Sequence, residues 1–141
     1  MTDSHLAVRY AHAVDQRDGE ALGSVFAPDA VFVLDPAMAR PGQPAQWQGR
    51  DAIVEGVLAG VAGLIATRHE ILGQSRPTGN TTLTYCQAHH IFEHRGVPTD
   101  EVLAVRYLDT LVGDGDEWLI ERREVYLDWS WRQEVRLPRR S

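Results

Sequence analysis

The chain has 141 residues, of which 43% are hydrophobic and 24% are charged, and its formal net charge is −6 at pH 7. This length and composition predict one domain, residues 1–141, that buries its core without disulfides or metals. The acidic balance argues against a general nucleic-acid binder, which needs an excess of lysine and arginine facing the phosphates.

The single cysteine, Cys86, excludes an internal disulfide framework and a metal site built on thiolates, and it fits a reducing compartment. The first residues lack the basic and continuously apolar regions of a signal peptide. Nowhere does the sequence offer about 18 consecutive apolar residues, as a membrane span requires. We therefore expect a cytoplasmic protein that binds neither nucleic acid nor membrane.

The first half of the chain reads as three helices, one strand and a loop. Apolar residues at helical spacing predict a helix over residues 4–16, and a short second helix is expected within 17–26. A strand is predicted over 27–35. The next stretch, 36–49, contains three prolines and two glycines, so we expect a loop long enough to be the lid or rim of a pocket. A third helical pattern covers 50–65.

The second half contains four strand-like runs separated by turn signals, over residues 65–77, 80–94, 100–112 and 117–130. No helical pattern interrupts them, which disfavours a parallel βαβ arrangement. Three helices followed by long antiparallel strands predict an α+β fold, in which one curved sheet covers helices on a single face. Such a sheet can leave a pocket between its concave face and the helices.

A histidine lies in the middle of the segment "LIATRHEILGQ", which otherwise reads as a buried strand. Strand alternation places His69 on one face with Ile65, Thr67, Ile71 and Gly73. The simplest interpretation is a core histidine satisfied by one hydrogen bond. A carboxylate partner would instead fix the tautomer and leave the other ring nitrogen as a general base near neutral pH.

The first helix offers such a partner. Asp15 falls on the border of the apolar stripe at the end of the helix, where it can face inward or remain solvated. Negative charge at a helix C-terminus is mildly unfavourable, which is consistent with a functional position. Tyr10 lies within the stripe, and it suits either a core position or a hydroxyl donor in a pocket.

Five segments are spread over nearly the whole chain: "YAHAVDQRDGEALGSVFAPDAVF", "QGRDAIVEGV", "ATRHEILG", "TLTYCQAHHIF" and "LAVRYLDTLVGDGDEWLIERREVYLDW". In this order they resemble the SnoaL-like branch of the nuclear transport factor superfamily. The resemblance implies a cone-shaped α+β barrel, a strongly curved mixed sheet with three N-terminal helices enclosing a pocket. The motifs are most similar to the scytalone dehydratase and bile-acid dehydratase types. There, a tyrosine and an aspartate on the first helix and a histidine after the third helix form the catalytic set. Tyr10, Asp15 and His69 occupy the matching positions.

The resemblance also implies a second histidine on the following strand, for which the sequence offers His89, His90 and His94. Parity decides only between two sets, and the resemblance implies that the set with His90 faces the pocket, so we prefer His90 as the side chain that contacts substrate. A zinc site from these three residues is disfavoured, because His89 and His90 are consecutive on a strand and point to opposite faces. We expect no metal and no cofactor.

Two further residues are candidate substrate contacts. Arg123 matches an arginine common in the family, and it can anchor a substrate anion or serve as the structural partner of Glu101 or Asp109, a role we slightly favour. Trp47, near the end of the proline-rich loop, is expected to help set the volume of the pocket, together with Met38.

A histidine–aspartate pair without a nucleophile or metal suits proton transfer, and we therefore expect a cofactor-independent dehydratase acting on a small cyclic, mostly apolar hydroxylated substrate, of polyketide or steroid type. One alternative is an isomerase similar to ketosteroid isomerase, or a polyketide cyclase, with Asp35 as base alongside Tyr10 and Asp109. A small-molecule binder without catalysis is another.

A homodimer, or a homotrimer, is expected because the outer face of the sheet is predicted to carry aromatic and charged side chains suited to an interface. The residues assigned to that face are Tyr107, Asp109, Arg122, Tyr126 and Trp118.

Overall fold

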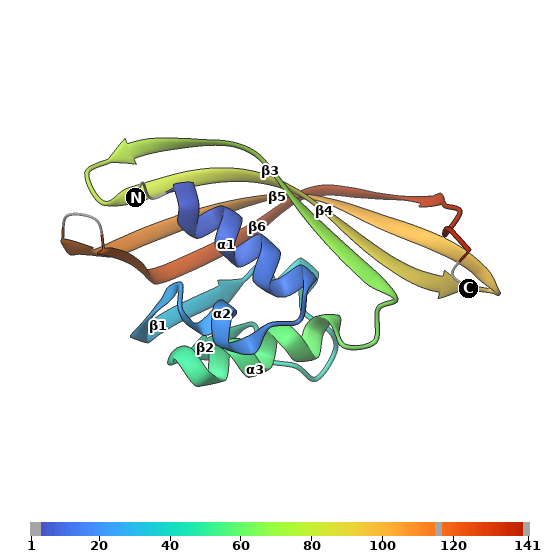
Figure 1. The fold of residues 1–141 in the computed structure, drawn as a ribbon, viewed down its shortest axis with the longest axis horizontal. Helices are drawn as coiled ribbons and strands as arrows, with labels where there is room; N and C mark the ends of the chain where they lie inside the picture. The colour runs from blue at the N-terminus through green and yellow to red at the C-terminus, as the bar shows by residue number, and fades with distance from the viewer. Residues whose placement is uncertain (1–3, 115–116, 140–141) are drawn as a thin grey trace.

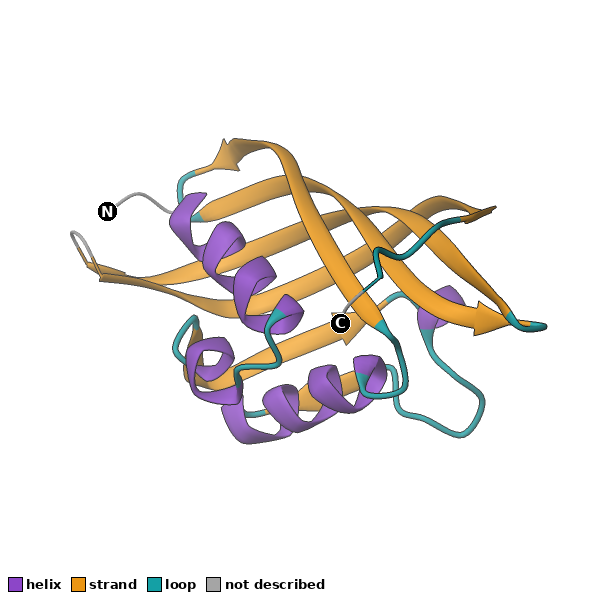
Figure 2. Ribbon diagram, turned by 45° about the vertical axis from the view of Figure 1, so that its right-hand side comes forward, coloured by secondary structure: helices purple, strands orange, loops and turns teal. Residues whose placement is uncertain are grey.

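The structure is a computed structural model that describes residues 4–114 and 117–139. In this part of the chain three α-helices lie on one face of a six-stranded sheet (Figures 1 and 2). The predicted α+β class is thus confirmed. None of these helices is long and apolar enough to cross a membrane.

The helices are α1 (Ser4–Asp15), α2 (Gly19–Gly23) and α3 (Arg50–Val61). The apolar stripe predicted for α1 is buried, with Leu6, Tyr10 and Val14 packed into the core. Helix α3 ends at Val61, four residues before its predicted end, because the backbone N–H of Ile65 already donates to the carbonyl of Ile91 on the sheet.

The six strands form one mixed sheet in the order β2-β1-β6-β5-β4-β3. Their bounds are β1 (Phe26–Leu34), β2 (Gln46–Gln48), β3 (Ala66–Thr78), β4 (Thr81–His94), β5 (Val97–Asp114) and β6 (Glu117–Glu134). The four last strands form an antiparallel meander, as expected, whereas β1 pairs in parallel with β6. This parallel pair makes the sheet mixed.

The sheet is strongly curved around the helices (Figure 2), but it is not closed, because β2 and β3 form its two edges. The expected barrel is therefore an open, curved sheet. The helices cover the concave face, so the space between the two layers is enclosed without a complete ring of strands.

The proline-rich stretch is not a plain loop. Pro36–Met38 forms a single 3-10 turn, started by Asp35, and β2 pairs with β1 so that Trp47 lies opposite Phe32. A three-residue strand gives too short an alternation to be recognised beside prolines and glycines. This strand brings the indole of Trp47 to the concave side of the sheet.

Three residues assigned to the outer face of the sheet lie on its inner face. Trp118 is one of them, because it lies on the same face of β6 as the buried Ile120. The other two, Tyr107 and Asp109, are buried, and they share the concave face with Val105 and Leu111. The assignment of these two was wrong because both parities of β5 carry apolar side chains, so that alternation alone did not distinguish the faces.

A β-bulge in β3 changes which residues face inward, so the predicted face of Gly73 was wrong. The register shifts between Ile71 and Gly73, so that Gly73 lies opposite the exposed Tyr85. Gly73 therefore does not share the face of His69, whereas Thr67 and Ile71, which precede the bulge, do.

Candidate active site

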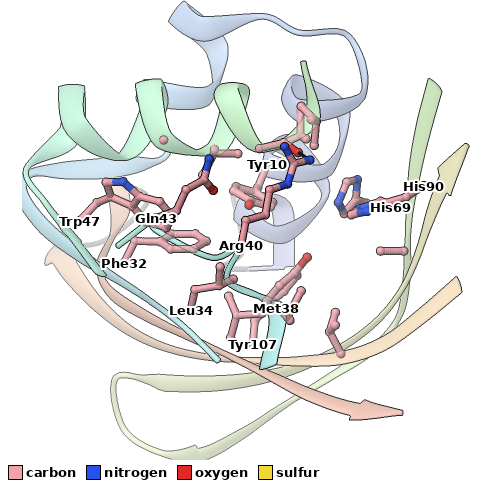
Figure 3. Close-up of a pocket in the computed structure, with 18 residues that line it drawn as sticks. Tyr10, Phe32, Leu34, Met38, Arg40, Gln43, Trp47, His69, His90 and Tyr107 are labelled. Carbon is pink, nitrogen blue, oxygen red and sulfur yellow. Dashed lines mark hydrogen bonds between the residues drawn. The ribbon is translucent and has the colours of Figure 1, made fainter. Parts of the chain in front are cut away.

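A cavity of about 140 Å³ lies between the helices and the concave face of the sheet (Figure 3). Its wall is mostly apolar, as is usual for small-molecule sites. The polar side chains that line it are those of Tyr10, Arg40, Gln43, Trp47, His69, His90 and Tyr107. The polar groups that bear on the chemistry gather where α1 meets β3 and β4.

His69 and Asp15 form a hydrogen-bonded pair at this end of the cavity. The ring Nδ1 of His69 lies 2.7 Å from Oδ1 of Asp15, and the backbone N–H of His69 donates to Oδ2 at 3.0 Å. The hydroxyl of Thr67 donates to Oδ1 at 2.9 Å. Burial raises the pKa of Asp15, but the hydrogen bonds from His69 and Thr67 outweigh it and hold that pKa below its ordinary value.

The ionised carboxylate fixes the tautomer of His69. Because a carboxylate only accepts hydrogen bonds, Nδ1 must carry the proton in their short contact. The other nitrogen, Nε2, has no hydrogen-bond partner among the described residues, and the ring lines the cavity. With 9% of its side chain exposed, His69 thus presents an unshared lone pair to an enclosed space.

Tyr10 approaches the same space from α1. Its ring meets that of His69 edge-on, with 6.5 Å between centroids, and it is buried. Burial raises the pKa of Tyr10 to about 12, so the phenol remains protonated at neutral pH and acts as a donor.

His90 lies beside His69 on the neighbouring strand, with 5.9 Å between the ring centroids, and it lines the cavity (Figure 3). Burial, followed by repulsion from His69, lowers the pKa of His90 to about 4, so its imidazole is neutral at pH 7. His89 points to the opposite face, where it contacts Asp100 and Glu70 at 2.6 and 2.9 Å. Among the described residues, no three His, Cys, Asp or Glu side chains are grouped so that they could hold a metal ion.

Arg123, a candidate substrate contact, does not line the cavity. Its side chain is 0% exposed, and its Nε and Nη2 donate to the two oxygens of Asp109, each at 2.8 Å. The guanidinium carbon lies 4.3 Å and 4.1 Å from the ring centroids of Tyr10 and Tyr107. Arg123 therefore packs against the rings of two buried tyrosines. Its partner, Asp109, is one of the two carboxylates named as candidates from the sequence.

Of the residues in the loop over the cavity, the sequence singled out Met38 and Trp47 as setting the pocket volume, but not Arg40 or Gln43. Met38, Arg40 and Gln43 line the cavity, and Arg40 donates to the carbonyl of Gly60 on α3 at 2.9 Å. The abundance of prolines and glycines was the signal for a rim here, but it does not say which side chains turn inward. Trp47 lines the cavity as expected, with its ring 5.9 Å from that of Phe32.

Asp35, the base of the alternative scheme, is not in the lining of the cavity. Its two oxygens accept from the backbone N–H groups of Leu127 and Ala37 at 2.9 and 3.0 Å. These two hydrogen bonds lower the pKa of Asp35. The side chain serves to cap a turn and to tie it to β6.

The sequence matches the SnoaL-like domain family over residues 4–124, and the chain belongs to this family. A search of the curated proteins gave no match.

Solved structures of the same fold align over most of this chain. A scytalone dehydratase-like protein from Novosphingobium aromaticivorans has a TM-score of 0.70 and 20% identity, covering 94% of this chain and 86% of its own. A protein from Catenulispora acidiphila with a ketosteroid isomerase-like fold, in complex with trimethylamine, has a TM-score of 0.70 and 20% identity. The alignment covers 89% of this chain and 86% of that protein. A polyketide cyclase-like protein from Sinorhizobium meliloti has a TM-score of 0.62 and 24% identity. The alignment covers 86% of this chain and 94% of that protein.

Proposed function

We propose that this protein is a cofactor-independent dehydratase that removes water from a small cyclic, mostly apolar hydroxylated molecule. The observation that carries the proposal is the 2.7 Å contact between Nδ1 of His69 and Asp15, with Nε2 left free at the wall of an apolar cavity. This is the arrangement of a general base whose tautomer is fixed by a carboxylate.

In the proposed reaction, Nε2 of His69 removes a proton from the carbon next to a carbonyl, and the electron pair of the C–H bond moves into an enolate. Asp15 stabilises the imidazolium that results. The enolate then re-forms the carbonyl and a carbon–carbon double bond as the C–O bond to the hydroxyl breaks. The imidazolium returns its proton to the departing hydroxide, which leaves as water, so that no external acid or oxidant is needed.

Two neighbours of His69 have roles in this scheme. The protonated hydroxyl of Tyr10 donates to the carbonyl oxygen as negative charge develops there. The neutral imidazole of His90, 5.9 Å from that of His69 between ring centroids, can hydrogen-bond the leaving hydroxyl without competing for the proton. Both act on atoms of the substrate that change charge during the reaction.

The size of the cavity favours a substrate with a single ring. At about 140 Å³ it is close to the roughly 150 Å³ of an engineered protein cavity that holds one benzene molecule. A steroid or a fused polyketide would require the loop over the cavity to move outward. We therefore propose monocyclic β-hydroxy carbonyl compounds as the first class to test.

The alternatives receive less support. An isomerase or cyclase that uses Asp35 as its base needs that carboxylate in the cavity, whereas its oxygens are engaged by two backbone N–H groups. A non-catalytic binder does not require the short pair between His69 and Asp15.

The decisive experiment measures loss of water from a panel of monocyclic β-hydroxy ketones, followed by the new conjugated absorbance. We expect turnover by the wild type, little or none by His69→Gln, and near-normal turnover by His94→Gln, a change at an exposed histidine outside the cavity. Asp35→Asn should also keep most of the activity. Equal turnover by wild type and His69→Gln would contradict the proposal.

We also propose that the chain forms a homodimer through the outer face of its sheet. Tyr85 and Trp129 are exposed there, at 50% and 64%, and Arg106 lies opposite Tyr85 with its guanidinium over the ring of Tyr126. Aromatic and arginine side chains are enriched at interfaces. Light scattering coupled to gel filtration should give twice the chain mass of 15.8 kDa, and Trp129→Lys should reduce it to the monomer value.

A further inference from the structure

Arg17 follows the C-terminal end of α1 and adopts a left-handed backbone conformation that is unfavourable for a residue with a side chain. Its φ is 57°, in the left-handed region where glycine is usual. The backbone N–H groups of Arg17 and Asp18 donate to the carbonyls of Val14 and Ala13, which closes the helix before Asp18 caps α2. A non-glycine residue held in this region points to a constraint elsewhere on the side chain.

The side chain of Arg17 provides that constraint. Its Nη1 donates to the hydroxyl of Thr67 at 2.8 Å and to the carbonyl of Val14 at 2.7 Å, and Nη2 donates to the carbonyl of Val61 at 3.3 Å. The guanidinium thus joins the C-terminal ends of α1 and α3 to β3. Both helix ends carry the negative pole of a macrodipole, which favours a cation at this place.

The hydrogen bond from Arg17 to Thr67 determines where the hydroxyl proton of Thr67 is donated. A hydroxyl has one proton to donate and two lone pairs. Because the guanidinium can only donate, it occupies a lone pair, and the Thr67 proton is donated to Oδ1 of Asp15 at 2.9 Å. The same oxygen contacts Nδ1 of His69 at 2.7 Å. A polarised chain therefore runs from the arginine through the hydroxyl and the carboxylate to the imidazole.

We propose that Arg17 is a positioning residue for the His69–Asp15 pair, acting through Thr67 to hold the carboxylate ionised and correctly oriented. This inference rests on the proposed function for its effect on turnover, but not for its effect on the pair itself. It assigns a role to a side chain that does not line the cavity and whose hydrogen bonds go to Thr67, Val14 and Val61 rather than to the pair.

The structure supplies a matched control for the test. Arg95, in the turn between β4 and β5, is the other non-glycine residue described with positive φ, at 53°, and it is exposed. Arg17→Gly and Arg95→Gly each remove a guanidinium and relieve the same backbone strain, so neither is expected to unfold the protein. Thr67→Val interrupts the chain at its second member, and Thr67→Ser restores the hydroxyl.

The first measurement is made by NMR and needs no substrate. In the wild type, ¹⁵N shifts of the His69 ring should report a single tautomer protonated at Nδ1, and the Asp15 carboxyl should titrate below its ordinary range. In Arg17→Gly and Thr67→Val we expect mixed tautomers and an Asp15 midpoint that moves upward. Arg95→Gly and Thr67→Ser should resemble the wild type. Wild-type tautomer and titration in both Arg17→Gly and Thr67→Val would overturn the inference.

The second measurement is turnover of the substrate found in the dehydration screen. We expect kcat to fall about tenfold in Arg17→Gly with less than about a twofold change in KM, since substrate contacts are retained and only the orientation of the base is lost. If Arg17 had a purely structural role, Arg17→Gly would lower the stability of the protein while leaving kcat and the tautomer of His69 unchanged. If no substrate is turned over, the NMR arms still decide the inference, so its failure is distinguishable from failure of the proposed function.

Discussion

The carboxylate of Asp15 contacts His69 at two points, the ring Nδ1 at 2.7 Å and the backbone N–H at 3.0 Å. One oxygen serves each contact. The pair therefore sets the orientation of the imidazole, and it also fixes where the end of α1 meets β3. If the proposed function holds, chemistry and packing depend on the same side chain, although the two residues lie 54 positions apart.

This double contact predicts a large effect of Asp15→Asn. An amide cannot stabilise the imidazolium as a carboxylate does, and an amide turned to donate would force the proton of His69 to Nε2. We expect kcat to fall by about 10²-fold or more. Steady-state kinetics checks this. The control is Asp18→Asn, which removes one charge three residues away but retains the cap on α2, because asparagine is an equally good N-cap. Similar kinetics for the two variants would contradict the role given to Asp15.

His90 predicts a pH-dependent loss of stability. In the unfolded chain His90 takes up a proton as the pH falls through about 6.5, whereas in the folded protein burial lowers its pKa to about 4. Between these two pKa values the unfolded state binds more protons than the folded state. The free energy of unfolding is therefore unaffected by the titration of His90 above about pH 6.5 and decreases as the pH falls below it. Allowing for partial exposure, the loss is on the order of 2 kcal/mol.

Urea unfolding at pH 7.5, 6 and 5 measures this loss, with His90→Gln for comparison. Glutamine does not titrate, so the variant should lose less stability than the wild type over the same interval, whatever its stability at pH 7.5. Parallel pH dependences for the two proteins would show that His90 titrates normally in the folded state.

The buried ion pair predicts that Arg123→Met is strongly destabilising. The change leaves the carboxylate of Asp109 buried without its partner, which costs about 3–5 kcal/mol. Replacing both partners, in Asp109→Leu with Arg123→Met, should restore much of that loss. Arg132→Met serves as the control, because its pair with Glu101 is exposed and such pairs contribute about 0–1 kcal/mol. Thermal and urea unfolding distinguish these outcomes, and equal losses for the two single variants would contradict the argument.

Gly56 predicts a steric coupling between α3 and the cavity wall. A Cβ on Gly56 would lie 2.5 Å from Cε2 and Nε1 of the Trp47 ring, so Gly56→Ala must displace the indole. The clash, at about 1–3 kcal/mol, outweighs the gain in helix propensity of up to about 1 kcal/mol.

Gly60→Ala is the matched substitution on the same helix, because a Cβ there meets nothing within 4 Å. We expect Gly56→Ala to unfold at a lower urea concentration and to change the tryptophan fluorescence, and Gly60→Ala to be neutral or slightly stabilising. A stabilising effect of Gly56→Ala would show that Trp47 moves without cost.

Periodicity was sufficient to predict much of the fold and several of the candidate positions. The helical stripe of α1 and the alternation of β3 placed Tyr10 and His69 on apolar faces. Asp15 fell on the border of the stripe, and His90 was preferred on the family resemblance. The structure brings all four to one end of the concave face. These patterns are local, and each element carries a clear difference between its two faces.

The remaining features depend on tertiary contacts that no local pattern reports. Tyr107 was assigned to the wrong face because β5 is apolar on both sides. Strand β2 is only three residues long, and it is defined by its partner β1. Arg17 and Thr67 lie in segments that resemble the family, but neither was given a role, because a threonine in a strand and an arginine after a helix are ordinary until a 2.8 Å contact joins them.

The parallel pairing of β1 with β6 has a consequence for the order of assembly. Strand β6 is the last in sequence, yet it lies inside the sheet, between β1 and β5. During synthesis on the ribosome the hairpins of β3, β4 and β5 can form as they emerge, whereas β1 must wait for residues 117–134 before it gains a neighbour on that side. The chamber that holds His69 is therefore completed only when the final strand inserts, so a nascent chain stalled before this point would expose its apolar lining.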